Sequence, residues 1–257
     1  DTVARPPAGR EWTAAVIEAI GPDTAVVALP HCHWTDGSLL DLAAIGRAAR
    51  QVGASLVVDA TQSLGALPFD VQAVQPDYLV AASYKWLLGP YSMGFLYVAP
   101  HRAGDRPLEH AWSNRMGAEN FARLVDYQDT FGPGMKRMDV GEFSQFHLMP
   151  MAIAAMEQVL DWGVENIAAT LALATSGLAQ RAASMGLQAP PGHLRAPHFL
   201  GLRFPGGVPD GLLDHLVAHR VFASVRGDSM RITPHLYNNP ADFDRLFSAL
   251  GSVVTHG

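Results

Sequence analysis

Two clusters of polar side chains, each at the end of an apolar segment, carry the strongest chemical signal in this sequence. Asp59 ends the apolar segment 55–59, and Gln62 follows three residues later. The second cluster, Ser83–Lys85, directly follows the apolar segment 78–82. Short, continuous apolar segments are typical of the strands of a parallel sheet. Because ligands of open α/β sheets bind beyond the carboxyl ends of the strands, we expect both clusters to face one crevice.

The rarity of lysine points to an amine as a reactive group. Lys85 and Lys136 are the only lysines, against 16 arginines. Lys136 lies in a polar segment, where an exposed charge is expected. Lys85 follows a strand that we expect to be buried, and burial lowers the pKa of an ammonium group. A neutral amine is the form that attacks a carbonyl group to make an imine, so Lys85 is the candidate for that chemistry.

The segments around these residues resemble the cofactor-binding region of the class V aminotransferases. These are fold-type I enzymes that use pyridoxal phosphate (PLP), and the group includes cysteine desulfurases and kynureninases. The similar segments are Val57–Gly65, Pro76–Leu79, Ser83–Pro90 and Ser224–Asn238, together with the loop His33–Gly37. The resemblance extends from about Glu11 to Leu250 and implies PLP as the cofactor.

The resemblance also implies a role for each polar residue at the strand ends. Lys85 would hold PLP as an imine, and Asp59 would lie against the pyridine nitrogen and keep it protonated, so that the ring accepts electrons. Gln62 would donate to the ring phenolate. Ser83 and Tyr84 offer hydroxyl groups to the phosphate, and a tyrosine before the lysine is also found in kynureninases.

Four further residues are implied by similar positions elsewhere in the family. Arg231 would bind the α-carboxylate of the substrate through two parallel hydrogen bonds, and Arg226 is a second candidate. Trp112 and Asn114 lie in a stretch that approaches cofactor or substrate in kynureninase-like proteins, partly across a dimer interface. The resemblance therefore implies a homodimer.

The expected fold is α/β, with the fold-type I arrangement of a large mixed-sheet domain (1–165) and a smaller C-terminal α+β domain (166–257). Members of the family are longer, and we expect the missing sequence to lie upstream. Helices are predicted at 11–20, 39–52, 150–162, 164–185, 210–219 and 241–254, and strands at 24–30, 55–59, 78–82, 93–98, 198–204, 221–225 and 230–233. Asp36–Ser38 supplies a start signal for the second helix, and 100–134 reads as irregular chain around one short helix. The apolar strands predict a sheet covered on both faces.

Composition excludes several classes of function. The net charge is −6 with no basic stripe, so a nucleic acid partner is not expected. No apolar segment approaches the roughly 20 residues of a membrane helix. The single cysteine, Cys32, excludes an intramolecular disulfide and favours a reducing, cytoplasmic location. His31, His33, His198 and His235 lack metal-ligand spacing, so we expect no metal site and mostly structural histidines.

These observations favour a PLP-dependent enzyme that acts on the amino group or Cα of an amino acid, a class V aminotransferase first. A kynureninase-like or other PLP lyase or epimerase is an alternative, because all of them share the same carbanion chemistry. A catalytically silent PLP-fold binding protein is a second alternative. Cysteine desulfurase activity is disfavoured, because 226–229 contains no cysteine where those enzymes carry their persulfide-forming residue.

Overall fold

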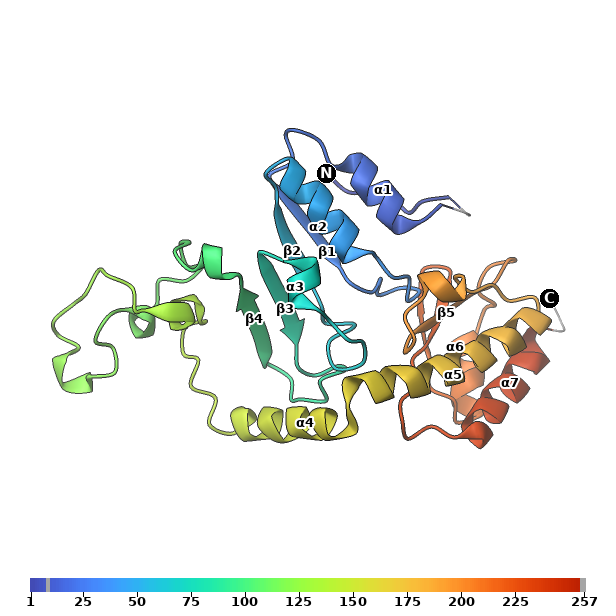
Figure 1. Ribbon diagram of the computed structural model, residues 1–257. Helices are drawn as coiled ribbons and strands as arrows, with labels where there is room; N and C mark the ends of the chain where they lie inside the picture. Colours follow the sequence, from blue (N-terminus) through green and yellow to red (C-terminus); the bar gives the residue numbers. More distant parts are fainter. Residues whose placement is uncertain (8–9, 255–257) are drawn as a thin grey trace.

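The computed structural model describes residues 1–7 and 10–254, and its N-terminal half is built on a four-stranded sheet (Figure 1). The strands are β1 (Val26–Pro30), β2 (Ser55–Asp59), β3 (Tyr78–Ala82) and β4 (Gly94–Val98), paired in that order. The first three are parallel and β4 is antiparallel to β3. Each strand begins within two residues of its predicted start and ends at its predicted residue, and the mixed α/β class is confirmed.

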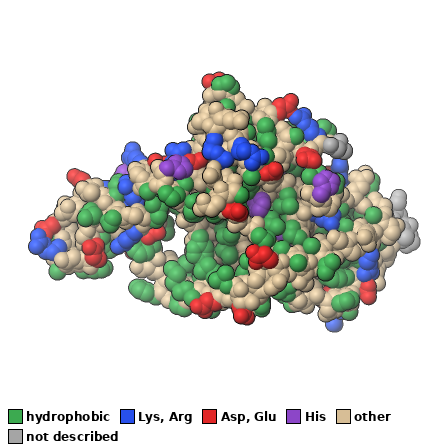
Figure 2. Space-filling model, in the orientation of Figure 1, with side chains coloured by type: hydrophobic (Ala, Val, Ile, Leu, Met, Phe, Trp, Pro, Cys, Tyr) green, Lys and Arg blue, Asp and Glu red, His purple; other side chains and the backbone are tan. Residues whose placement is uncertain are grey.

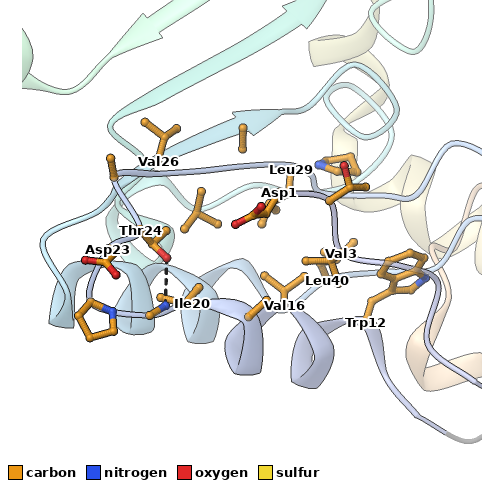
Figure 3. Close-up of a pocket in the computed structure, with 18 of the residues that line it drawn as sticks. Asp1, Val3, Trp12, Val16, Ile20, Asp23, Thr24, Val26, Leu29 and Leu40 are labelled. Carbon is orange, nitrogen blue, oxygen red and sulfur yellow. Dashed lines mark hydrogen bonds between the residues drawn. The ribbon is translucent and has the colours of Figure 1, made fainter.

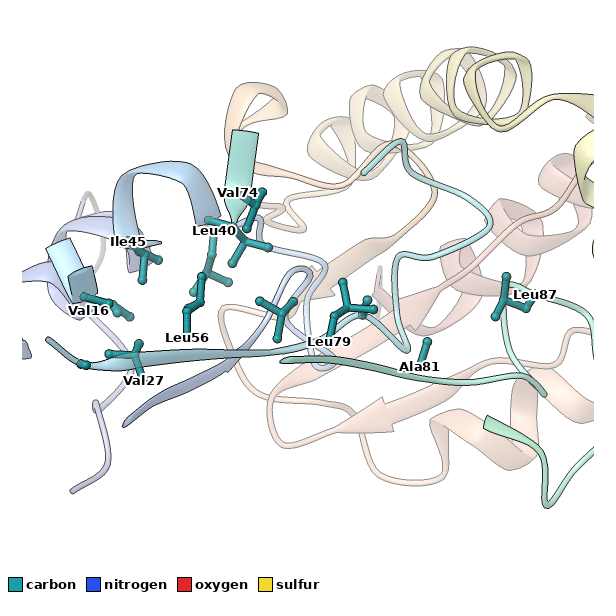
Figure 4. Close-up of a cluster of buried hydrophobic side chains, with 14 residues drawn as sticks. Val16, Val27, Leu40, Ile45, Leu56, Val74, Leu79, Ala81 and Leu87 are labelled. Carbon is teal, nitrogen blue, oxygen red and sulfur yellow. The ribbon is translucent and has the colours of Figure 1, made fainter. Parts of the chain in front are cut away.

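Three helices cover one face of this sheet: α1 (Trp12–Ala19), α2 (Leu42–Gln51) and the short α3 (Val71–Val74). Their apolar side chains pack on alternate residues of the strands to form the first hydrophobic core, which Figure 4 shows between helices and sheet. The predicted start signal of α2 at Asp36–Ser38 is wrong. Asp41 caps this helix instead, because its carboxylate accepts a hydrogen bond from Ala44 N at 2.8 Å.

The opposite face of the sheet remains partly open within the described residues. Val80 and Leu96 are paired across β3 and β4 on that face, and their side chains are 38% and 43% exposed. The prediction of a sheet covered on both faces is therefore wrong for this part of the chain. The apolar pattern of the strands predicts that this face is buried, but it does not predict which element packs on it.

After β4 the chain makes a long irregular excursion that lies beyond the sheet edge, away from the C-terminal unit (Figure 1). It contains four 3₁₀ segments, η1 (Pro100–Arg102), η2 (Trp112–Asn114), η3 (Phe121–Arg123) and η4 (Gly134–Met138). Many of its apolar side chains are exposed, among them Leu108, Phe121, Tyr127 and Phe146. The prediction of one short helix here underestimated how often the chain turns.

Helices α4 (Leu148–Trp162) and α5 (Val164–Ser184) lead from the excursion to a C-terminal unit. That unit has η5 (Gly192–Leu194), strands β5 (Leu200–Arg203), β6 (Ser224–Arg226) and β7 (Ser229–Ile232), and helices α6 (Leu212–Ala218) and α7 (Pro240–Val254). Its antiparallel sheet has the order β5-β7-β6 and supports a second core. The first half of α5 packs on Trp86, whereas its last turns pack in the second core. The helix therefore contacts both units, and the predicted domain boundary between 165 and 166 stays a prediction.

Candidate active site

The turns that follow β2 and β3 lie against each other at the carboxyl edge of the sheet, as predicted. Ala60 N donates to Val80 O at 2.8 Å, and Ala82 N donates to the hydroxyl of Thr61 at 3.1 Å. Gly65 brings the two turns into direct contact: it has φ +98°, and a Cβ there would lie 2.4 Å from Trp86 O. Only glycine fits this position, since a side chain would force the two turns apart.

Asp59 ends β2 with an exposed carboxylate. Its Oδ1 accepts a hydrogen bond from Thr61 N at 2.9 Å, which fixes the orientation of the group. The local capping role expected of a strand-end aspartate is therefore real, but it uses one oxygen, so Oδ2 can still accept a hydrogen bond. Gln62 follows as a buried residue, 8% exposed, in the same turn.

Lys85 is half-buried, and three charged side chains influence its pKa. Burial lowers the pKa of Lys85, and the Arg231 guanidinium lowers it further. The Asp59 carboxylate acts in the opposite direction and raises this pKa, while Arg226 adds to the lowering. Lys85 and the three residues that shift its pKa are separated by as much as 172 positions in the chain. Their net effect, together with burial, is that the Lys85 amine loses its proton more readily.

Arg231 reaches this environment from β7 of the C-terminal unit. Its guanidinium lies over the ring of Phe199, 5.1 Å from the centroid, and its Nε is buried without a hydrogen-bond partner. Burial lowers the pKa of Arg231, as does Arg226, whereas Cys32 raises it. Cys32 itself is fully buried, and burial raises the pKa of its thiol, which disfavours the reactive thiolate form.

Ser83 and Tyr84 begin the lysine turn. The Ser83 hydroxyl donates to Pro90 O at 2.6 Å, so its only hydrogen already has an acceptor. The Tyr84 ring stacks on Tyr91 with centroids 4.3 Å apart, and the Lys85 amine lies 5.8 Å from the Tyr84 centroid. Tyr84 is 39% exposed, so it can still meet a ligand.

Trp112 and Asn114 are not brought to Lys85 within this chain. Both lie in η2, in the excursion beyond β4 (Figure 1). Asn114 is buried and donates to Arg137 O and Asp139 O at 3.3 and 2.9 Å, which holds the excursion together. Trp112 donates to the Glu142 carboxylate at 3.2 Å. Any contact with a pocket would have to be made in another subunit.

Sequence reasoning missed a direct link between the C-terminal unit and the Gln62 turn. His198 is fully buried, and its Nε2 lies 2.6 Å from Gln62 O; because a carbonyl oxygen only accepts, Nε2 donates. The same ring contacts Trp86 edge-on, with centroids 4.4 Å apart. Burial lowers the pKa of His198 to about 4. No local pattern marks this contact, since its partners are 136 residues apart.

A separate cavity of about 720 Å³ lies between α1, the first residues of the chain and β1, and it takes in none of the predicted site residues. Figure 3 shows Asp1, Val3, Val16 and Val26 among the residues that line it. Among the described residues, no cluster of three or more histidine, cysteine, aspartate or glutamate side chains could hold a metal ion. The charged groups that act on one another at the strand ends are an amine, a carboxylate and two guanidinium groups.

Comparison with known proteins agrees with this chemistry. Residues 4–123 match the family model for class V aminotransferases. The uncharacterised aminotransferase YcbU of Bacillus subtilis is 28% identical over 92% of this chain and 62% of its own length. Isopenicillin N epimerase of Streptomyces clavuligerus is 32% identical over 50% of this chain and 33% of its own length. Cysteine desulfurases and kynureninases match shorter segments.

A solved structure of the lyase C-DES, with glycine covalently linked to its PLP cofactor, superposes with a TM-score of 0.80 at 22% identity. The match covers 95% of this chain and 64% of that one, so the two share the fold. The present chain spans about three fifths of the length of YcbU and of the C-DES chain. The matched segment and the relatives make the chain similar to the class V aminotransferases, and it has the fold of the fold-type I proteins.

Proposed function

We propose that the chain is part of a PLP-dependent enzyme that acts on the amino group or Cα of an amino acid, first of all as a class V aminotransferase. The observation that carries this proposal is the lysine environment: one half-buried amine of lowered pKa influenced by one carboxylate and two guanidinium groups. The family match, and the PLP cofactor that the C-DES structure contains, support the same cofactor here.

The residues present fit PLP. Lys85 would be its covalent attachment point, and the carboxylate of Asp59 would meet the pyridine nitrogen through the oxygen that Thr61 leaves free. Gln62 would donate to the ring oxygen. Tyr84 is the better candidate for the phosphate, since the hydrogen of the Ser83 hydroxyl already goes to Pro90; the role of Ser83 stays a prediction. When bound, PLP supplies an electron sink for the bond broken at the substrate Cα.

The chain's own residues would perform two tasks in the reaction. The buried Nε of Arg231 has no partner in the described structure, and a substrate carboxylate would satisfy it while fixing the orientation of the Cα. The Lys85 amine, whose pKa is lowered, would then take up the Cα proton, and the ammonium group so formed would release it in a later step. The Asp59 carboxylate at the strand end would oppose loss of the ring proton.

The two lysines make a direct test of the cofactor proposal. The purified chain incubated with PLP should absorb near the visible edge, at the band of a lysine-linked cofactor. Lys85→Ala should lack that band, and Lys136→Ala, in an exposed 3₁₀ segment, should keep it as the matched control. A blank spectrum for the wild type, or an unchanged one for Lys85→Ala, contradicts the proposal.

Epimerisation or lysis is the second candidate, favoured by the 32% identity to isopenicillin N epimerase. A panel of amino acids, assayed with and without pyruvate or 2-oxoglutarate, separates the two. Turnover that requires the keto acid indicates transamination. Product that forms without it indicates an epimerase or lyase.

We also propose that the enzyme works as a homodimer in the cytoplasm. Large apolar side chains are exposed along α4 and α5, namely Met149, Met151, Ile153, Leu160 and Leu173, and Figure 2 shows hydrophobic side chains gathered beside these helices. A face of this kind favours association. Trp112 and Asn114 would then approach the partner's pocket. Analytical ultracentrifugation tests this proposal, with a monomer as the contrary result.

Among the described residues, no helix is long and apolar enough to cross a bilayer.

A further inference from the structure

Two arginines of the C-terminal sheet lie on the same face. Ser224 on β6 is the cross-strand partner of Arg231 on β7, and Arg226 follows Ser224 by two residues. Side chains alternate along a strand, so Ser224, Arg226 and Arg231 all point to one side. Diagonal neighbours of this type lie roughly 7–8 Å apart, well within the combined reach of two arginine side chains.

No carboxylate of the described chain neutralises either guanidinium. The nearest acid in sequence, Asp228, pairs with Arg203 at 2.8 Å instead. Arg226 Nη1 donates to the carbonyl of its own neighbour Val225, and neither Arg226 nor Arg231 is found among the ion pairs of the described residues. Arg231 keeps its buried Nε unsatisfied. Neither guanidinium therefore has an acidic partner among the described residues.

The charges that act on Lys85 are consistent with binding of more than one negative charge. Arg226 and Arg231 both act on Lys85, and Asp59 is the acid that opposes them. A substrate with one carboxylate would neutralise one guanidinium and leave the other facing it unpaired. A substrate with two carboxylates would neutralise both, and each charge-assisted contact contributes more than a neutral hydrogen bond.

We propose that Arg226 binds a second acidic group, so that the preferred substrates are amino acids and keto acids with a carboxylate on the side chain. Arg231 takes the α-carboxylate, and Arg226, on the more exposed strand, takes the distal one. This inference rests on the proposed function for the identity of the reaction. The preference for substrates with two carboxylates rests on the two arginines alone.

Binding of succinate and butyrate tests the preference without any turnover. Both have four carbons, and they differ in one carboxylate. Isothermal titration calorimetry of the wild type should give tighter binding of succinate by about 10- to 100-fold, the range expected for one charge-assisted contact. Arg226→Gln should bring the ratio close to one, and Arg226→Lys should keep part of it, because the charge remains but the fork is lost.

Arg47→Gln is the matched control. Arg47 is an exposed arginine of α2, in the other unit, and its loss should leave the ratio at the wild-type value. Equal affinities in the wild type overturn the inference, as does a ratio that survives in Arg226→Gln. These outcomes are separate from failure of the proposed function, which is read from the spectrum of Lys85→Ala: a normal spectrum with no succinate preference contradicts only the dicarboxylate site.

Discussion

Acid should weaken the attachment of the C-terminal unit through His198. Burial lowers the pKa of this side chain from 6.5 to about 4, so the unfolded chain takes up a proton at pH values where the folded chain does not. The unfolding free energy should therefore be unaffected above pH 6.5, fall as the pH drops from 6.5 to 4, and level off below that. The fall of the His198 pKa from 6.5 to about 4 corresponds to roughly 3 kcal/mol over this window.

Two substitutions separate proton uptake from the hydrogen bond to Gln62. His198→Gln retains an N–H donor of similar reach and removes the titrating group, so its unfolding free energy should depend less on pH, by about 1.4 kcal/mol per unit. His198→Phe also removes the donor and should lose about 1–3 kcal/mol at pH 7. His31, whose pKa burial also lowers to about 4, still titrates in both variants.

Urea unfolding between pH 4.5 and 7.5 measures these differences, and the fluorescence of Trp86, which packs on the His198 ring, is a local probe. If the wild type and His198→Gln lose stability in parallel as the pH falls, His198 does not change its protonation on unfolding. The reasoning from burial would then be refuted.

Three further substitutions test the positioning of the strand ends. Gly65→Ala should destabilise the fold by at least about 2 kcal/mol and abolish the lysine-linked absorption, because the residue has φ +98° and a Cβ would meet Trp86 O; urea titration and the PLP spectrum measure both. Thr61→Val removes the acceptor of Ala82 N–H and should cost about 1 kcal/mol in unfolding free energy, with weaker PLP binding in a spectral titration. Asp77→Ala removes a buried carboxylate that accepts a hydrogen bond from a backbone N–H of β2 at 2.7 Å. The unfolding free energy should fall by about 3 kcal/mol in thermal unfolding, and an unchanged melting temperature would contradict this.

The parts of the site that sequence could predict are those specified by local pattern. Asp59 and Lys85 follow apolar segments whose bounds match β2 and β3, and parallel pairing alone brings the ends of such strands to one edge. The rarity of lysine then singled out the amine. Arg231 needed the family resemblance, because nothing in a short antiparallel strand indicates which distant turn it will face.

The parts that sequence could not predict depend on long-range packing or on very short elements. The donation from His198 to Gln62 joins two units and has no periodic signature. Helix α3 has four residues, too few to display a helical period, although Asp70 caps it through two backbone N–H groups. The start of α2 was misplaced because Asp36 resembles a cap, whereas in the structure it is buried and accepts from Arg5 and Ser38 N.

The positions of the two arginines connect substrate binding with the state of the lysine. While the guanidinium groups are unpaired, their charge adds to burial in lowering the pKa of Lys85, which favours the neutral amine. A carboxylate bound at Arg231 cancels part of that repulsion, so the pKa of the amine rises when a substrate is in place. An amine that must accept the Cα proton benefits from this order, because it becomes more basic once the substrate is in place. On this reasoning a dicarboxylate, by pairing with Arg226 as well, raises the basicity of Lys85 more than a monocarboxylate does.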